Sequence, residues 1–251
     1  MISFGEKVRQ TIMTSLDLLA FGAHPDDIEI GMGGTLAKYA KAGYKVGICN
    51  LTNAELSSNG TVQIRQEEAE RASKQLGVCK RIQLSFRDRG LKYITEEDLR
   101  KVVSLIRQFQ PKVIFAPFEI DRHPDHGECS RIINEAYFNA GIRQYRCYEN
   151  RKAYRPDNLF YYFINGYERP NFVIDITNEK KLKRQALLSY ESQFTMKNNS
   201  IQTPLTNDYI SAVEARDQLF GKEVGVHAAE GFMTPKPLII DQLLVGRGAN
   251  K

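Results

Sequence analysis

The chain has 251 residues, of which 42% are hydrophobic and 26% are charged, and its formal net charge is +5. A chain of this length can bury a sizeable core in a single domain, which excludes a small scaffold held together by disulfides. Lysine and arginine are interspersed with acidic residues, so we expect no nucleic-acid partner, although the excess charge suits an anionic substrate.

The four cysteines are far apart and form no CxxC pair, which favours free thiols in a reducing compartment. No apolar run approaches the ~18 residues that a membrane span needs, and the N-terminus lacks the apolar core of a signal peptide. We therefore expect a cytoplasmic protein without a membrane partner. We divide the chain into an N-terminal extension, residues 1–15, and a single domain, residues 16–251.

Short apolar segments alternate with helical patterns along the first half of the chain. Strands are predicted at 16–21, 44–51, 81–84 and 113–116, and helices at 35–42, 62–76 and 96–108, with a glycine-rich turn at 31–34. Two strands, 160–164 and 172–176, and two helices, 180–190 and 209–220, follow. This alternation predicts an α/β fold: a Rossmann-like three-layer sandwich with a mostly parallel sheet and a C-terminal α+β extension.

Two similar tetrapeptides follow predicted strands and contain three of the four histidines. The first is His24-Pro25-Asp26-Asp27, and the second is His123-Pro124-Asp125-His126. Imidazole and carboxylate side chains are the ligands that zinc prefers, and a catalytic site keeps about three of them with one position open for water. Because ligands of a parallel sheet lie at the carboxyl ends of its strands, we expect the two tetrapeptides to meet there.

The two tetrapeptides, in this order and setting, resemble the LmbE or PIG-L family of metal-dependent deacetylases. Further segments resemble the Bacillus-type branch, whose members include the deacetylase of N-acetylglucosaminyl malate in bacillithiol biosynthesis. These segments are Glu29-Ile30-Gly31-Met32, Asp88-Arg89-Gly90-Leu91, Asp121-Arg122-His123 and Tyr190-Glu191-Ser192-Gln193-Phe194. One departure is Asp121, where some mycobacterial relatives place a tyrosine.

The resemblance implies roles for particular residues. His24, Asp27 and His126 would bind Zn²⁺, although Fe²⁺ or Co²⁺ would suit the same donors. Asp26 would be the general base, and His123 the acid or electrophilic partner, kept protonated by Asp125.

Five further residues are expected to bind the substrate: Arg65, Arg122, Glu55, Tyr190 and Gln193. Arg122 would pair with the malate carboxylate through its guanidinium fork. The family also suggests a homo-oligomer, a trimer or hexamer.

The expected activity is zinc-dependent hydrolysis of the N-acetyl group of an N-acetylglucosamine conjugate, N-acetylglucosaminyl malate first among them. Two alternatives stay open. One keeps the chemistry and changes the substrate to another N-acetyl sugar, such as a chitin fragment. The other is a non-catalytic sugar-binding module that contains zinc, which the free carboxylate of Asp26 and the open ligand position disfavour.

Overall fold

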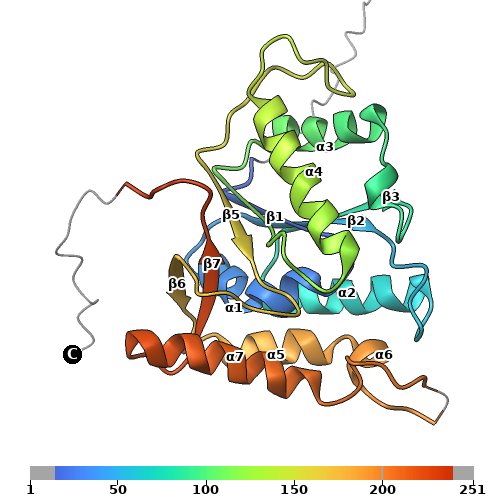
Figure 1. Cartoon of the computed structure of the whole chain (residues 1–251), viewed down its shortest axis with the longest axis vertical. Coiled ribbons are helices and arrows are strands. Elements are labelled where there is room, and N and C mark those ends of the chain that lie inside the picture. The colour runs from blue at the N-terminus through green and yellow to red at the C-terminus, as the bar shows by residue number, and fades with distance from the viewer. Residues whose placement is uncertain (1–14, 199, 240–251) are drawn as a thin grey trace, which may run out of the picture.

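The computed structural model describes residues 15–198 and 200–239 (Figure 1). Its strands are β1 (Leu18–Gly22), β2 (Val46–Thr52), β3 (Lys80–Phe86), β4 (Val113–Pro117), β5 (Asn158–Tyr162), β6 (Phe172–Asp175) and β7 (Ala229–Met233). Its helices are α1 (Asp27–Lys41), α2 (Val62–Leu76), α3 (Glu96–Phe109), α4 (Pro124–Ala140), α5 (Lys180–Leu188), α6 (Glu191–Phe194) and α7 (Tyr209–Val224), with a 3-10 turn at Leu91–Tyr93. The expected extension, residues 1–15, lies outside the described residues except for Ser15.

The strands of the described chain form one sheet in the order β3-β2-β1-β4-β5-β7-β6. Strands β1 to β5 run parallel, and β7 is antiparallel to both β5 and β6. The predicted Rossmann-like α/β fold is confirmed, and the C-terminal strands extend the same sheet. Among the described residues, no helix combines the length and apolar character needed to cross a bilayer.

Helices cover both faces of the sheet, and each face has its own apolar core. One core lies between the sheet and helices α3 and α4, and the other involves α1, α2, α5 and α7. Figure 1 shows α5, α6 and α7 on the outer side of α1 and α2. The central strand β1, Leu18–Gly22, is covered on both faces and is apolar throughout.

The local sequence accounts for several helix boundaries. Thr61 begins α2 by accepting a hydrogen bond from the backbone N–H of Ile64, and Gly77, with φ 71°, ends it. Thr95 and Asp98 form a reciprocal capping box at the start of α3. Helix α4 starts with Pro124 at its first position, where the missing N–H costs no helical bond. We did not predict α4, α6 or β7.

Helix α1 differs from the prediction because it begins at Asp27 rather than at residue 35. The glycine-rich segment 31–34 lies inside the helix, and the backbone is non-helical only at Met32. The N–H groups of Gly34 and Thr35, just beyond this kink, donate to the carboxylate of Glu230 at 2.8 and 2.6 Å. Buried backbone groups need such partners, so a helix capped by Glu230 replaces the expected turn.

The carboxylate at the kink belongs to a buried charged cluster. Lys183 Nζ lies 2.8 Å from Glu230 Oε1 and 2.6 Å from Asp217 Oδ2. Arg216 donates to the carbonyl of Ile30, just before the kink, at 3.0 Å. Charges from α5, α7 and β7 therefore hold both sides of the break in α1.

Gly31 has no room for a side chain. A Cβ atom there would overlap with Cδ2 of Tyr162 and would lie 2.8 Å from the carbonyl oxygen of Phe163. We expect Gly31→Ala to lower the free energy of unfolding by about 3 kcal/mol, the upper end of the usual cost of overpacking. Urea denaturation measures the change. Gly166→Ala, where a Cβ would meet no atom within 4 Å, is the control; equal unfolding midpoints for the two variants would contradict this packing.

Candidate active site

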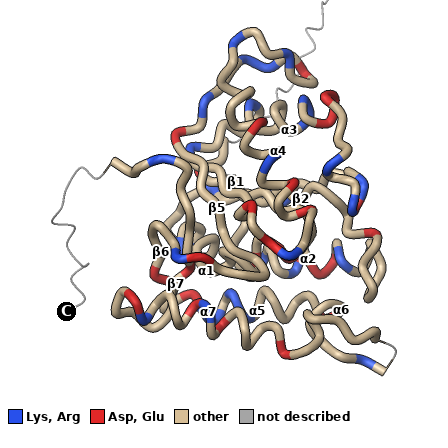
Figure 2. Tube along the Cα trace, in the orientation of Figure 1, with Lys and Arg blue, Asp and Glu red and all other residues tan. Residues whose placement is uncertain are grey.

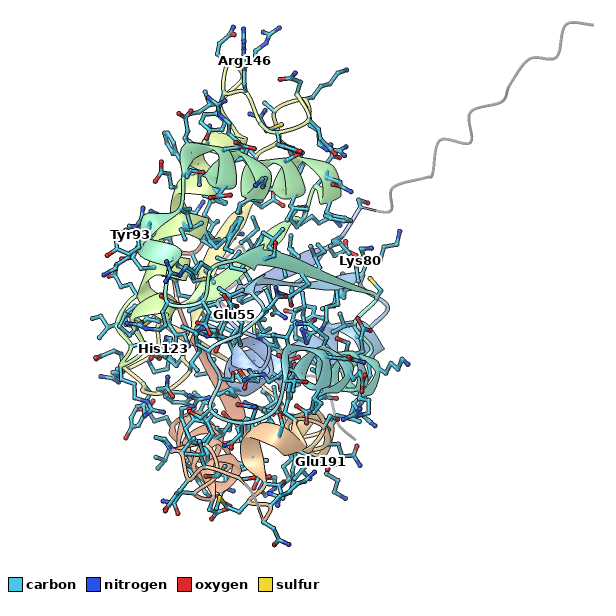
Figure 3. The ribbon with its side chains drawn as sticks, turned by 90° about the vertical axis from the view of Figure 1, so that its right-hand side faces the viewer. Glu55, Lys80, Tyr93, His123, Arg146 and Glu191 are labelled. Carbon is cyan, nitrogen blue, oxygen red and sulfur yellow. The ribbon has the colours of Figure 1, made fainter. Side chains whose placement is uncertain are left out.

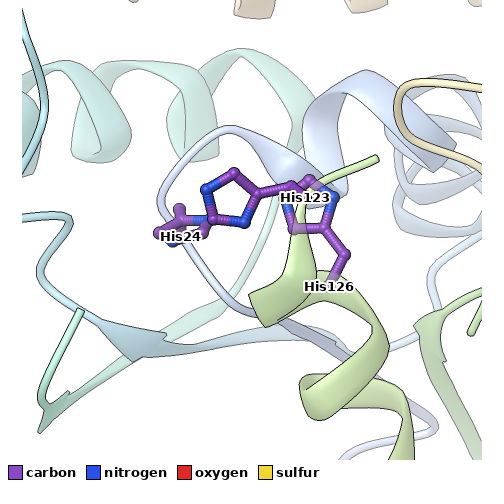
Figure 4. Close-up of side chains that lie close together, drawn as sticks. All are labelled: His24, His123 and His126. Atoms are coloured by element: carbon purple, nitrogen blue, oxygen red, sulfur yellow. The ribbon is translucent and has the colours of Figure 1, made fainter. Parts of the chain in front are cut away.

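The loops after β1 and β4 meet at the carboxyl edge of the sheet. Strand β1 pairs with β2 on one side and β4 on the other, so the strand order reverses beside it, as at the ligand sites of open α/β sheets. The ring of His24 lies 4.7 Å from that of His123 and 5.5 Å from that of His126, measured between centroids (Figure 4). The two tetrapeptides therefore converge as expected.

Asp27 lies between two of these imidazoles. Its Oδ1 is 3.1 Å from Nε2 of His126, and its Oδ2 is 3.5 Å from Nδ1 of His24. Donors bound at about 2.0–2.2 Å to a tetrahedral ion lie roughly 3.3 Å apart, so both separations suit a shared ion. All three side chains are buried. Ligand atoms of His24, His123 and His126 also lie within 4.8 Å of one another. His24 and His126 could therefore hold one divalent metal together with Asp27 or His123.

Each of these histidines presents its second ring nitrogen to another carboxylate. His24 Nε2 lies 3.1 Å from Asp88 Oδ1, and His126 Nδ1 lies 3.0 Å from Asp121 Oδ1. Burial lowers the pKa of both imidazoles, but the surrounding carboxylates outweigh burial and raise the pKa to about 10 for His24 and about 9 for His126. Carboxylates in this position orient metal-binding imidazoles, a role that sequence reasoning assigned to neither aspartate.

Asp26 lies beside the three donors with its carboxylate unused by them. As the residue before α1 it has φ 106°, a backbone conformation that non-glycine residues rarely adopt outside functional sites. Its Oδ2 accepts a hydrogen bond from Arg65 Nη2 at 3.0 Å, and Arg65 also donates to the carbonyl of Pro25. Burial raises the pKa of Asp26 to about 7, although the charge of Arg65 lowers it. Such a carboxylate can exchange a proton near neutral pH.

The predicted pairing of Asp125 with His123 is wrong. Asp125 Oδ2 accepts the backbone N–H of Arg89 at 2.6 Å and lies 3.8 Å from His24 Nε2. Residues two positions apart at the start of a helix project in different directions, which separates the two side chains. Burial and the neighbouring imidazoles lower the pKa of His123 to about 4, so its protonated form is disfavoured. Its buried Nδ1 finds no hydrogen-bond partner within the described chain.

A cavity of about 440 Å³ opens onto these groups. Three of the predicted substrate-binding residues, Arg65, Arg122 and Gln193, line it, and so does Arg89, for which we predicted no role. Arg122 is exposed and donates to Asn165 Oδ1 at 2.9 Å. The cavity wall thus contains one buried arginine, Arg65, which pairs with Asp26, and two exposed arginines, Arg89 and Arg122.

Glu55 and Tyr190, also predicted to bind substrate, do not line this cavity. Glu55 accepts the backbone N–H of Asp88 at 2.8 Å, so it supports the residue whose carboxylate faces His24. Tyr190 is fully buried, donates to Glu29 Oε1 at 2.7 Å and accepts from Arg81 at 3.0 Å. Both side chains therefore act on the framework behind the site.

The far wall of the cavity consists of two segments, residues 57–59 and 203–205. Asn59 links them through Ile201. The Asn59 amide donates to the carbonyl of Ile201 and accepts the N–H of the same residue, both at 2.8 Å. Gln193 donates to the carbonyl of Asn59 at 2.8 Å. Pro204 and Leu205, which follow Ile201, line the cavity. Sequence reasoning missed this connection, because nothing in the pattern links position 59 to position 201.

Comparisons with known proteins agree with this geometry. The family model described as PIG-L, GlcNAc-PI de-N-acetylase, matches residues 19–137. The chain is 30% identical over 202 residues to the diacetylchitobiose deacetylase of Thermococcus kodakarensis, covering 75% of this chain and 74% of that protein. It is 24% identical over 207 residues to the probable N-acetyl-alpha-D-glucosaminyl L-malate deacetylase 2 of Bacillus anthracis, covering 76% and 87%.

A solved structure extends the similarity to most of the fold. The crystal structure of the conserved protein TT1542 from Thermus thermophilus is 36% identical, covers 90% of this chain and 97% of its own, and superposes with a TM-score of 0.81. Sequence, fold and the convergence of both tetrapeptides thus agree with the resemblance seen in the sequence. The chain belongs to the PIG-L (LmbE) family of deacetylases.

Proposed function

We propose that this protein hydrolyses the N-acetyl group of an N-acetylglucosamine conjugate in a metal-dependent reaction. The observation that carries the proposal is the position of Asp27 between His24 and His126, with the carboxylate of Asp26, which pairs with Arg65, beside them. Three protein donors leave a position for water, which distinguishes a catalytic metal site from a closed structural one. Zinc is the metal we propose, because two imidazoles and one carboxylate form a common donor set for catalytic zinc.

The reaction needs an activated water, a stabilised oxyanion and a proton for the leaving amine. When bound, the metal ion lowers the pKa of a coordinated water and polarises the acetyl carbonyl. Asp26 accepts the proton of the attacking water and then delivers it to the departing amine. Arg65 holds the Asp26 carboxylate in place during both transfers. The bond that breaks is the amide C–N bond, and the products are acetate and a free amine.

His123 supports the oxyanion in this scheme. Its ring stacks on that of His126, with 4.7 Å between centroids, and it lines the cavity. Because the carboxylates of the described residues do not keep it protonated, we revise the expected imidazolium to a neutral imidazole whose ring N–H donates a hydrogen bond to the carbonyl oxygen. A neutral donor of this kind strengthens its bond as negative charge develops in the transition state.

The preferred conjugate, we propose, carries an acidic group next to the sugar, as N-acetylglucosaminyl malate does. Arg89 and Arg122 line the cavity, and guanidinium groups bind carboxylates in a bidentate manner. The similarity to the Bacillus anthracis enzyme supports this choice. Diacetylchitobiose is the second candidate, favoured by the higher identity to the Thermococcus kodakarensis enzyme.

Asp26→Asn tests the general base. We expect turnover to fall by about 100-fold to 10,000-fold while zinc still binds with one equivalent per chain, since the change removes the proton acceptor and leaves the donors intact. Asparagine tolerates the positive φ of this position better than most residues. Asp208→Asn, at another positive-φ aspartate outside the cavity, is the control. Full activity of zinc-loaded Asp26→Asn would remove Asp26 from the mechanism.

Asp121→Asn tests the metal centre. Loss of the carboxylate facing His126 should weaken zinc binding by about 10-fold to 100-fold, the usual effect of removing such an orienting partner. Competition with a chromophoric chelator measures the affinity. Glu119→Gln removes an exposed carboxylate on the same loop and should leave the affinity unchanged. If the two variants bind zinc equally well, His126 is not a ligand oriented by Asp121.

Arg122→Ala tests the acidic conjugate. We expect KM for N-acetylglucosaminyl malate to rise about tenfold, as the loss of one charge-assisted hydrogen bond predicts, with little change for N-acetylglucosamine or diacetylchitobiose. Amine release is measured for all three substrates. Arg131→Ala, an exposed arginine on α4 outside the cavity, is the matched control. Equal losses on the three substrates would discard the malate contact.

A further inference from the structure

The positive charge of this protein is concentrated in one short segment. Residues 143–155 contain five basic residues and one acidic residue, a net charge of +4 within a chain whose total is +5. The expectation of evenly interspersed charge is wrong for this segment. Figure 2 shows its basic positions grouped in the loop between α4 and β5. The rest of the molecule is close to neutral.

This basic loop lies at the opposite edge of the sheet from the active site. Helix α4 starts at the active site and ends at Ala140, and the loop then leads to Asn158, where β5 begins parallel to β4. Figure 3 places Arg146 at one end of the molecule and His123 well away from it. The charge of the loop therefore serves neither the metal donors nor the substrate cavity.

A buried arginine gives the basic loop a defined shape. Arg107 on α3 uses all five of its N–H donors on backbone carbonyls of the loop and the end of α4, at distances of 2.8 to 3.2 Å. These carbonyls belong to Asn139, Ala140, Ile142, Tyr145 and Arg151. The backbone N–H of Tyr148 adds a bond to the carbonyl of Arg100 at 3.3 Å. Hydrogen bonds from α3 therefore hold the backbone of the loop in place.

The same loop lines an open hollow of about 670 Å³. Exposed Arg143, Arg146 and Lys152 line it, together with the partly buried ring of Tyr145. Within the described chain no acidic side chain lines the hollow, and none of these three cations is paired with a carboxylate. Arg151 pairs with Glu149, which accounts for the one acidic residue of the segment.

We propose that this hollow binds a small anion that carries two or more phosphate groups, of about the size of a nucleotide. Several uncompensated cations on a fixed backbone favour a multivalent anion, and guanidinium forks match phosphate oxygens in a bidentate manner. The volume lies within the range of small-molecule sites, about 300–1,000 Å³. Tyr145 also lines the hollow and packs against the apolar core beneath it.

The test is calorimetric titration with inorganic tripolyphosphate, ATP and citrate at about 0.15 M salt, where exposed charges are strongly screened. We compare wild-type protein with the double variant Arg143→Ser, Arg146→Ser. The control is Lys180→Ser, Lys181→Ser, which removes two exposed cations on α5. Because the metal donors are the same in all three proteins, chelation of the metal by phosphate contributes equally to each.

We expect tripolyphosphate and ATP to bind the wild-type protein and the control alike, and to lose at least about tenfold in affinity in the Arg143, Arg146 variant. Equal affinity for tripolyphosphate and ATP would mean that the phosphates alone are recognised. Tighter binding of ATP would mean that the hollow also contacts the nucleoside. Lys152→Ser alone should weaken binding in the same direction. The proposal is overturned if wild-type protein binds neither phosphate ligand, if citrate binds as tightly, or if both double variants lose affinity equally.

Discussion

The burial of helix α1 is the constraint on which the rest of the structure depends. This helix carries Asp27 at its first position and lies between the sheet and the C-terminal helices (Figure 1). Its backbone leaves helical geometry at Met32, a fully buried residue, so the backbone groups near this kink need protein partners rather than water. Glu230 and Arg216 supply them from β7 and α7. The C-terminal third of the chain is therefore required to hold the first half of α1.

This arrangement links the far end of the chain to the candidate metal site. Glu29, two residues after Asp27, is fully buried and is held by Arg81 from β3 and Tyr190 from the C-terminal segment. A carboxylate without partners in this environment would cost several kcal/mol. Asp26 and Asp27 are thus presented by a helix start whose position is set by charged contacts on its opposite side. Preorganisation of this kind is what a site with precisely placed donors requires.

Sequence could predict the parts of the site that depend on local order. The spacing of His24 and Asp27, and their position after a strand, were enough to expect convergence with His126 at the sheet edge. The sequence could not predict the hydrogen-bond partners that reach these residues from distant segments. Asp88 reaches His24 from the loop after β3, and only the packed sheet brings them together.

Two errors share a physical cause. Tyr190 lies in a motif that resembles the family's, yet its hydroxyl is buried against Glu29 rather than open to substrate. Asp125 lies between two site histidines in the sequence, but the helix directs its carboxylate to the backbone N–H of Arg89. Proximity along the chain identifies which residues belong to a region and does not determine which way a side chain points. Direction depends on secondary structure, which was not predicted for α4.

The candidate metal donors and the substrate-facing wall of the cavity come from different parts of the chain. This separation suggests how one family can act on different sugar conjugates. The candidate metal donors and Asp26 come from the segments that directly follow β1 and β4, and the packed sheet leaves these segments little freedom. The opposite wall comes from the segment around Pro204 and Leu205, attached to the rest of the protein through Asn59 and Gln193. Such a wall can change in sequence without moving the donors. We therefore expect differences in sugar conjugate between relatives to be determined by this wall and by the arginines at positions 89 and 122, while the chemistry stays with the two tetrapeptides.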